Sequence, residues 1–187
     1  MRSLLASLAA GAAFFGACAT GSASSASAAS TVTAQSAEDE ALISAAILYN
    51  IARFSTWPED RTSGGGETAF SVCFEPQRTL AAAFATIAGK DVGGLPVQAV
   101  ALTPDRVPGA GCHVYFAASR LDRDVLSSIT SVGALTVGRE PRFLDRGGAV
   151  RISIDGKPRF SVNVASARQA GVKPSAKLLR LAQEVVE

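Results

Sequence analysis

The sequence predicts an α/β fold: a Rossmann-like, mostly parallel sheet flanked by helices, with a C-terminal antiparallel hairpin. Two observations lead to this class. Between residues 69 and 137, short apolar segments alternate with segments whose apolar residues recur at helical spacing. This alternation is typical of a parallel sheet with helices on both faces. From residue 150 onward, apolar and polar residues alternate on either side of Asp155-Gly156, which is typical of an antiparallel hairpin.

The N-terminal segment differs from the rest of the chain and predicts export. Arg2 is followed by the apolar run Leu4–Ala17, which is typical of a secretory signal peptide. Two processing routes fit: cleavage at the small residues 26–28, or lipid modification of Cys18. We therefore expect a signal peptide over residues 1–28, cleaved before Cys18 in the lipoprotein alternative. The protein is expected to be exported, either free or lipid-anchored.

The remaining sequence has the size of one domain. We expect residues 29–37, in a run rich in Ser, Ala and Thr, to form a flexible tether. Residues 38–187 are expected to fold as a single α/β domain with one core. The formal net charge of the whole chain is only +2. A dedicated nucleic-acid-binding protein would need a stronger basic excess, so nucleic acid is not an expected partner.

A segment rich in helix formers, Ala41–Pro58, opens the domain. Acidic residues at positions 38–40 precede it, where they favour a helix N-terminus, and Pro58 prevents the helix from continuing. Every residue between positions 44 and 50 is apolar, so the helix has no polar face over more than one turn. Packing into the core and contact with a partner or second copy both explain such a segment.

The four strands of the parallel sheet are predicted at Ala69–Phe74, Pro96–Leu102, Cys112–Ala117 and Ala134–Val137. A helix between the first two has apolar residues at helical spacing at Leu80, Ala83, Phe84 and Ile87. A second helix follows the third strand, and its buried stripe is predicted at Leu121, Val125, Leu126 and Ile129. Ser119, with Asp122 three residues later, resembles a capping box at the start of this helix.

The C-terminal part of the domain is predicted to contain a hairpin and a final helix. The two strands of the hairpin have their apolar residues at Val150, Ile152 and Ile154, and at Phe160, Val162 and Val164. Asp155-Gly156 between them indicates a two-residue turn. The final helix is expected from about Ser175, with Leu178, Leu181, Ala182 and Val185 facing inward.

Two cysteines, Cys73 and Cys112, remain once Cys18 is cleaved off or lipidated. An even number of cysteines in an oxidising compartment favours a disulfide, and two buried free thiols are the alternative. If the first strand lies between the second and third, both cysteines fall in the same region of the sheet. A bridge directly across adjacent parallel strands is geometrically awkward. We therefore expect Cys112, the first residue of its predicted strand, to lie at or just before that end of the strand.

The sequence shows no catalytic constellation, and we expect a protein that is not an enzyme and holds no cofactor or metal. His113 is the single histidine. It would face away from Cys112 in a strand, so a structural role is favoured over thiolate activation. The Cys-x-x-Cys, His-Glu-x-x-His and Gly-x-Ser-x-Gly motifs are absent. The turn after the first strand has no glycine-rich phosphate cradle, which disfavours nucleotide-dependent catalysis.

Two groups of residues remain as candidate binding sites. The turn after the first strand and the start of the second helix would line a crevice, at which a small-ligand-binding protein would use Glu75, Ser119 and Arg120. Between residues 139 and 159, basic residues outnumber acidic ones: Arg139, Arg142, Arg146, Arg151, Lys157 and Arg159 against Glu140, Asp145 and Asp155. This stretch is either a surface for a partner or anion, or a solvated, partly self-paired face.

Several segments together resemble the YfiR family of periplasmic regulators. They are Ala45–Pro58, Ala88–Val97, Cys112–Phe116, Phe160–Val164 and Gly171–Ala182. They cover nearly all of the mature chain in the order that the family has. Two departures are evident. No cysteine follows Cys112, so the second cysteine pair of the family is missing, and Thr136–Glu140 lacks the acidic or Ser-Asp ending of that strand in the family.

The resemblance implies an α/β fold and a regulatory role in the periplasm. Family members are often dimeric, so a homodimer is one expectation. Some restrain a membrane-bound diguanylate cyclase by binding its periplasmic sensor domain, which represses cyclic di-GMP output and biofilm formation. Cys73 and Cys112 match one cysteine pair of the family. We expect the partner to bind at the hairpin Ala149–Val164, including Arg151, Arg159 and Phe160, or at the first helix. A small-ligand-binding protein is the alternative function.

Overall fold

The computed structural model of the protein describes residues 25–103 and 111–187. In these ranges the main sheet has eight strands: β2 (Phe70–Phe74), β3 (Asp91–Val92), β4 (Leu95–Ala101), β5 (Val114–Ala117), β6 (Leu135–Gly138), β7 (Val150–Ser153), β8 (Arg159–Asn163) and β10 (Glu184–Val186). A separate antiparallel pair joins β1 (Ser55–Thr56) to β9 (Lys173–Pro174).

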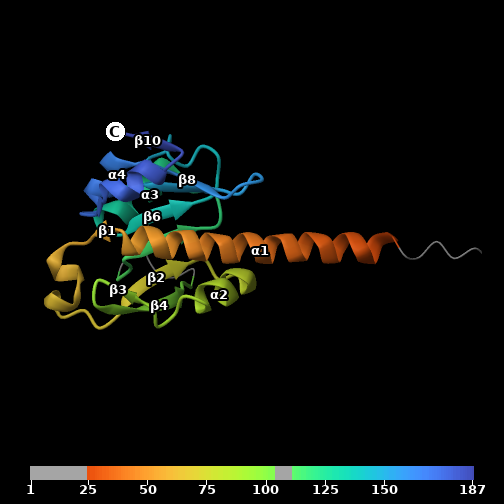
Figure 1. Ribbon diagram of the computed structural model, residues 1–187, viewed down its shortest axis with the longest axis horizontal. Coiled ribbons are helices and arrows are strands. Elements are labelled where there is room, and N and C mark those ends of the chain that lie inside the picture. Colours follow the sequence, from red (N-terminus) through yellow and green to blue (C-terminus); the bar gives the residue numbers. More distant parts are fainter. Residues whose placement is uncertain (1–24, 104–110) are drawn as a thin grey trace, which may run out of the picture.

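The order of strands in the main sheet confirms the predicted fold class. It runs β10-β8-β7-β6-β5-β2-β4-β3. The pairs β7–β8 and β3–β4 are antiparallel, and the other neighbours are parallel. The first predicted strand, β2, therefore lies between the second and third, β4 and β5 (Figure 1). The antiparallel pair β7–β8 is the predicted C-terminal hairpin.

The helices of the described ranges are α1 (Ser25–Arg53), α2 (Arg78–Ala85), α3 (Arg123–Ser131), α4 (Val164–Gln169) and α5 (Ala176–Leu181), and two 3-10 segments cover Glu59–Arg61 and Ser63–Gly65. Figure 1 shows the first half of α1 extending beyond the body of the domain. Residues 29–37, expected as a flexible tether, lie within α1. They contain neither Gly nor Pro, so nothing in them breaks a helix. None of the helices in the described ranges is long and apolar enough to cross a membrane.

Core packing accounts for the apolar segment of α1. Ala45, Leu48 and Ile51 are at most 1% exposed in the single chain. Ile47 and Tyr49 on the neighbouring faces pack, half-buried, against the same core. Leu42 is the most exposed large apolar residue among those of α1 whose burial is described, at 44%. The apolar segment of α1 is therefore buried largely within the single chain.

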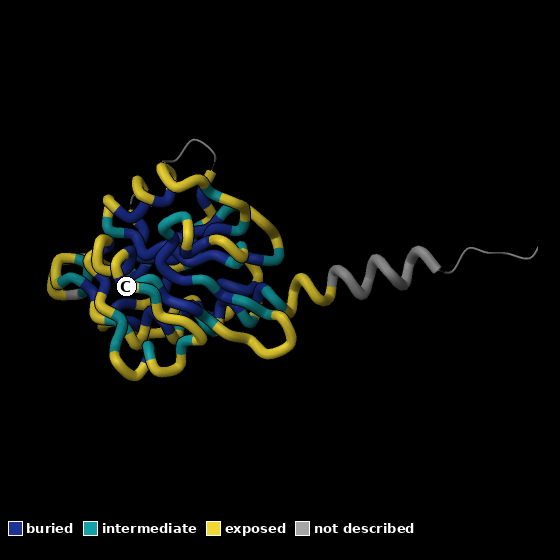
Figure 2. Tube along the Cα trace, turned by 90° about the horizontal axis from the view of Figure 1, so that it is seen from above, coloured by how far each residue is buried: buried dark blue, intermediate teal, exposed yellow. Residues whose placement is uncertain are grey.

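Buried side chains lie on both faces of the sheet, because successive strand residues point to opposite faces. On one face, residues such as Val72, Phe116 and Val137 join the buried side of α1 and α2 in a large cluster. On the other face, Tyr115 packs with α3 and with Phe143 in a smaller cluster. Figure 2 shows the buried residues concentrated inside the folded body and exposed residues around it. The continuous apolar character of the central strands follows from this two-sided burial.

The disulfide is formed, between Cys73 in β2 and Cys112, with 5.8 Å between the two Cα atoms. The residue of β5 that pairs with Cys73 is Tyr115. Cys112 lies two residues before β5 begins, as expected, where the backbone is not held in the ladder. Both cysteines are at most 2% exposed. The bridge therefore joins β2 to the entry of β5 from within the core.

The C-terminal end differs from the prediction of one long final helix. The helix α5 ends at Leu181, and the chain turns into β10, which pairs in parallel with β8. Leu178 is buried as expected, but Leu181 is 68% exposed and Val185 is 41% exposed. In one continuous helix these residues would share a face. Because the helix ends at Leu181, the residues after it no longer point to the same side as Leu178.

Two local details of the prediction also change. Ser119 does not cap α3: the N-cap residue Asp122 makes no side-chain capping bond, and Ser119 Oγ instead donates to Glu75 Oε1 at 2.7 Å. The loop of the hairpin is longer than the two residues expected, since β7 ends at Ser153 and β8 begins at Arg159. Gly156 has a φ of +79°, a conformation that favours glycine and holds the turn within this loop.

Candidate functional site

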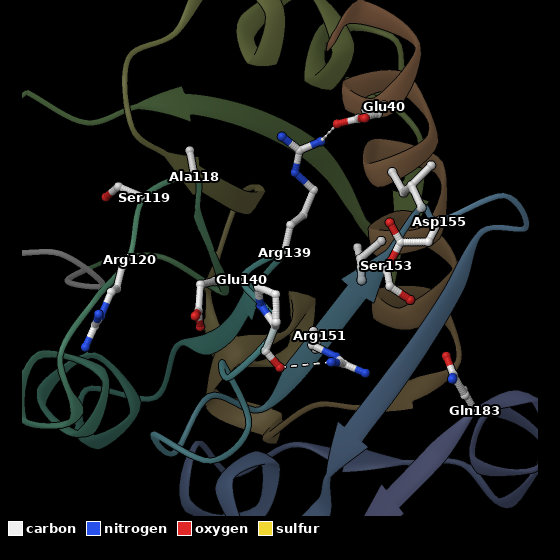
Figure 3. Close-up of a pocket in the computed structure, with 13 residues that line it drawn as sticks. Glu40, Ala118, Ser119, Arg120, Arg139, Glu140, Arg151, Ser153, Asp155 and Gln183 are labelled. Atoms are coloured by element: carbon white, nitrogen blue, oxygen red, sulfur yellow. Dashed lines mark hydrogen bonds and ion pairs between the residues drawn. The ribbon is translucent and has the colours of Figure 1, made fainter. Parts of the chain in front are cut away.

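A pocket of about 540 Å³ lies at the edge of the sheet where the parallel strands end (Figure 3). Because β5, β6 and β7 run in the same direction, the residues that follow them meet at this edge. The helix α1 and the segment before β10 complete the wall. The lining residues are Glu40, Ala118, Ser119, Arg120, Arg139, Glu140, Pro141, Arg151, Ile152, Ser153, Ile154, Asp155 and Gln183.

Some charges of the pocket neutralise one another. Arg139 Nη1 forms an ion pair with Glu40 Oε2 at 2.7 Å, which links the end of β6 to α1. Glu140 is bound by the guanidinium of Arg146 and accepts the backbone N–H of Arg142 at 3.0 Å. The side chains of the Arg139–Glu40 pair are 34% and 45% exposed. A pair so exposed contributes about 0–1 kcal/mol to folding, so its main effect is to position both side chains.

Two arginines of the pocket have no carboxylate partner among the described residues. Arg151 Nη1 donates to the carbonyl oxygen of Pro141 at 2.9 Å, while its Nε is buried and has no acceptor there. Arg120 forms no ion pair with any described residue and is exposed. Figure 3 shows Arg139 directed toward Glu40, away from Arg120 and Arg151. The pocket therefore combines one satisfied arginine with two that keep unused donors.

The structure joins residues from two groups that were predicted for different kinds of binding. Ser119 and Arg120, predicted for a ligand crevice, line the same pocket as Arg151, predicted for partner binding. Glu75, the third crevice residue, is held by Ser119 and does not line the pocket. The crevice and the basic stretch are therefore neighbouring parts of one edge of the sheet.

The other predicted partner-binding residues, Arg159 and Phe160, line a second hollow of about 390 Å³ together with Pro158, Leu181 and Gln183. Arg151 and Arg159 lie on one face of the hairpin, because Arg151 pairs with Ser161, and Arg159 with Ser153. Phe160 points to the other face, where it packs half-buried against the larger core cluster. Arg159 is exposed. Gln183 lines both hollows, so the two lie side by side.

Sequence reasoning missed several residues of this edge. Glu40 and Gln183 line the pocket although neither had been predicted for a binding site. Glu40 meets Arg139 across 99 residues of sequence, and no local pattern indicates such a pairing. Leu181 was expected inside and lies instead at the second hollow. The sequence signal for this change is the Gln-Glu-Val-Val-Glu segment at residues 183–187, whose pattern fits a strand as well as a helix.

His113 has the structural role that the sequence favoured. Its ring is 1% exposed. Its Nδ1 accepts the backbone N–H of Ser71 at 3.1 Å, and its Nε2 lies 2.8 Å from the carbonyl oxygen of Arg61, to which it donates. Both ring nitrogens are therefore satisfied in the neutral imidazole. Burial lowers the pKa of His113 below its usual 6.5, more strongly than the bond to the carbonyl of Arg61 raises it.

This lowered pKa predicts that the protein loses stability as the pH falls below about 6.5. The unfolded chain takes up a proton on His113 at pH values where the folded protein resists it, so protonation favours unfolding. We expect the wild-type free energy of unfolding to fall more steeply between pH 6.5 and pH 5 than that of His113→Gln. The ceiling is about 1.4 kcal/mol per pH unit. Urea unfolding at a series of pH values measures both slopes, and equal slopes would contradict the assignment.

The remaining sequence predictions concern lipid and metal. Cys18, the predicted lipidation site, lies outside the described residues. Within the described ranges, no group of three or more His, Cys, Asp or Glu side chains could hold a metal ion. The only histidine is satisfied by backbone groups, and both cysteines of the domain are bridged.

Burial raises the pKa of Tyr115, beside the bridge, to about 12, and the charge of Glu75 adds to this shift.

Comparisons with known proteins match most of the domain. A sequence model of the family described as YfiR/HmsC-like matches residues 41–183. No curated protein matches the sequence. A solved structure of a conserved domain protein from Vibrio cholerae O1 biovar eltor matches at 14% identity and a TM-score of 0.42, covering 63% of this chain. The match spans 54% of that protein, about half of its length.

Proposed function

The chain belongs to the YfiR/HmsC-like family, and we propose that it is an exported regulator that binds the periplasmic region of a membrane signalling protein. The family is one of periplasmic regulators that generally act with a membrane signalling partner. The observation that carries the proposal is the extent of the family match, which runs from the buried part of α1 to the segment before β10. The finer proposal is that the partner is a diguanylate cyclase, whose cyclic di-GMP output the protein represses.

The proposed contact surface is the exposed side of the hairpin and its neighbour α5. Arg159 is exposed on β8, and Leu181 is 68% exposed beside it at the second hollow. An exposed leucine next to an arginine provides the apolar area and the directional charge that interfaces commonly use. Phe160 lines the same hollow and is half-buried, with part of its side chain packed against the larger core cluster.

The proposed mechanism is stoichiometric and needs no catalytic group. Binding of the regulator to one conformation of the sensor region shifts the partner toward that conformation, by the difference in affinity for its two states. A rigid sheet with a disulfide between β2 and the entry of β5 presents the hairpin in one geometry. Such preorganisation lowers the conformational cost of association.

The proposal predicts that removal of the protein raises cyclic di-GMP in the source organism. Wild-type protein restores the low level, whereas Arg159→Glu does not, because a like-charge contact at an interface costs several kcal/mol of binding. Lys173→Glu is the matched control, since Lys173 is an exposed cation in β9 of the separate two-stranded sheet. Cyclic di-GMP is measured by mass spectrometry, and immunoblots verify equal protein levels. An unchanged level after deletion contradicts the diguanylate cyclase partner, and full restoration by Arg159→Glu contradicts the proposed surface.

A further inference from the structure

The pocket at the carboxyl ends of the strands has the position of a ligand site. The strand order reverses at β2 and β5, because the chain leaves β2 for β4 on one side and returns to β5 on the other. In open α/β sheets, ligands bind in the crevice outside the carboxyl ends of the strands at such a reversal. The pocket lies beside this reversal: it begins at Ser119 after β5 and runs along the carboxyl edge to Asp155 after β7. Its volume of about 540 Å³ is that of a small-molecule site rather than an ion site.

The charges in the pocket favour an anionic ligand. Glu40 is occupied by Arg139, and Glu140 by Arg146. Among the described residues, this leaves the carboxylate of Asp155 and the guanidinium groups of Arg120 and Arg151 without ion-pair partners. Asp155 is exposed in the loop of the hairpin, whereas Arg151 is half-buried within the wall. The positive charge that lies deepest and is not neutralised is therefore that of Arg151.

Arg151 is held in place but is not satisfied by the protein. One of its five N–H groups donates to the carbonyl of Pro141, which fixes the end of the side chain. Its Nε is buried without an acceptor in the described structure, and a buried donor in this state lacks a partner that native proteins usually provide. A carboxylate or phosphate group matches the planar fork of arginine and forms its strongest hydrogen bonds.

We propose that this pocket binds a small organic oxyanion, a carboxylate or a phosphate ester, with Arg151 as its principal contact. Arg120 contributes positive charge at the rim, and the amide of Gln183 offers a further donor from the wall. Ile154, which is half-buried in the wall, offers apolar surface to the carbon part of the ligand, whereas Ile152 is fully buried in the core behind it. This inference concerns the chemistry of the pocket and does not depend on the membrane partner.

The test is titration of the oxidised wild-type protein with succinate and, separately, with glycerol phosphate, at constant ionic strength. Isothermal titration calorimetry is expected to show saturable binding of at least one of them. The compound with the lower dissociation constant identifies the class of oxyanion, carboxylate or phosphate ester. Arg151→Gln is expected to weaken binding at least about tenfold, the loss of one charge-assisted contact. Arg168→Gln removes the same charge from an exposed position in α4, outside this pocket, and is expected to leave the affinity unchanged.

A second measurement covers the outcome in which Arg151→Gln fails to fold. In the wild-type protein, ligand-induced shifts of backbone amide resonances are expected at Ser119, Arg139 and Asp155, around the pocket. Shifts that saturate at these residues support the site without any variant. Two results would overturn the inference: no saturable binding of either compound, or an equal loss of affinity in the two arginine variants, which would indicate general charge attraction.

Discussion

Replacing both domain cysteines, Cys73→Ala with Cys112→Ala, is expected to lower the free energy of unfolding by about 4 kcal/mol. The bridge joins residues 39 apart in sequence, so its loss frees a loop of that length in the unfolded chain. Both side chains are almost fully buried, so the bridge also fills space in the smaller core cluster. For a domain of this size the melting temperature should fall by about 8–16 °C.

The matched control for the bridge is reduction of the wild-type protein. Reductant should lower the wild-type melting temperature toward that of the double variant and should leave the double variant unchanged. Calorimetry with and without reductant measures all four values. If the double variant melted at the wild-type temperature under oxidising conditions, the bridge would not stabilise this fold. No second pair compensates for its loss, since no cysteine follows Cys112 in the sequence.

Truncation of Phe143, as Phe143→Ala, is expected to cost about 3–5 kcal/mol, the range for a fully buried aromatic residue. Its ring is 0% exposed in the loop between β6 and β7. The loop is folded around it: the N–H of Phe143 donates to Glu140 and its carbonyl accepts from Gly148. A Cβ added at Gly138 would lie 2.6 Å from the ring, and one at Gly148 would also collide with it. The two glycines therefore create the space that the ring fills.

Double variants test this account of the loop. Gly148→Ala alone is expected to destabilise by about 1–3 kcal/mol, because the added methyl group overpacks the site. Combined with Phe143→Ala, it should cost less than the sum of the two, since the ring that it strikes is gone. Urea unfolding of the four proteins gives the coupling energy. Strict additivity would contradict the proposed contact. The same loop carries Pro141, whose carbonyl accepts from Arg151. Loosening of the loop should therefore also weaken this hydrogen bond.

The central sheet could be predicted from sequence because its signals are local. Residues 70–74 and 114–117 are short apolar runs that suit strands buried on both faces, and both form neighbouring strands. The stripe Leu80, Ala83, Phe84 and Ile87 is buried as its helical spacing indicates. The bridge Cys73–Cys112 also followed from a count of cysteines and the expected export. Each of these predictions depends on residue types and spacing that are visible within a few residues, or on compartment.

The binding edge could be predicted only in part, because its contacts join distant segments. Ser119 has the spacing of a helix cap but bonds to Glu75 across the sheet, where a carboxylate acceptor is available. Arg139 finds Glu40 on α1, and the exposure of Leu181 depends on where α5 ends. These outcomes are decided by tertiary geometry, which overrides the local preference of each residue. The surface proposed for the partner therefore combines Arg159, which the sequence indicated, with Leu181, whose exposure depends on the fold.

The measurement that tests the regulatory role most directly is site-specific photo-crosslinking in cells. A photoreactive residue replaces Arg159 at the proposed surface in one strain and Lys173 on the separate two-stranded sheet in another. We expect the position of Arg159 to capture a membrane protein that combines a periplasmic sensor region with a cytoplasmic signalling domain, identified by mass spectrometry. The position of Lys173 should not capture it. Capture of no such protein at Arg159, or equal capture at both positions, would contradict the account.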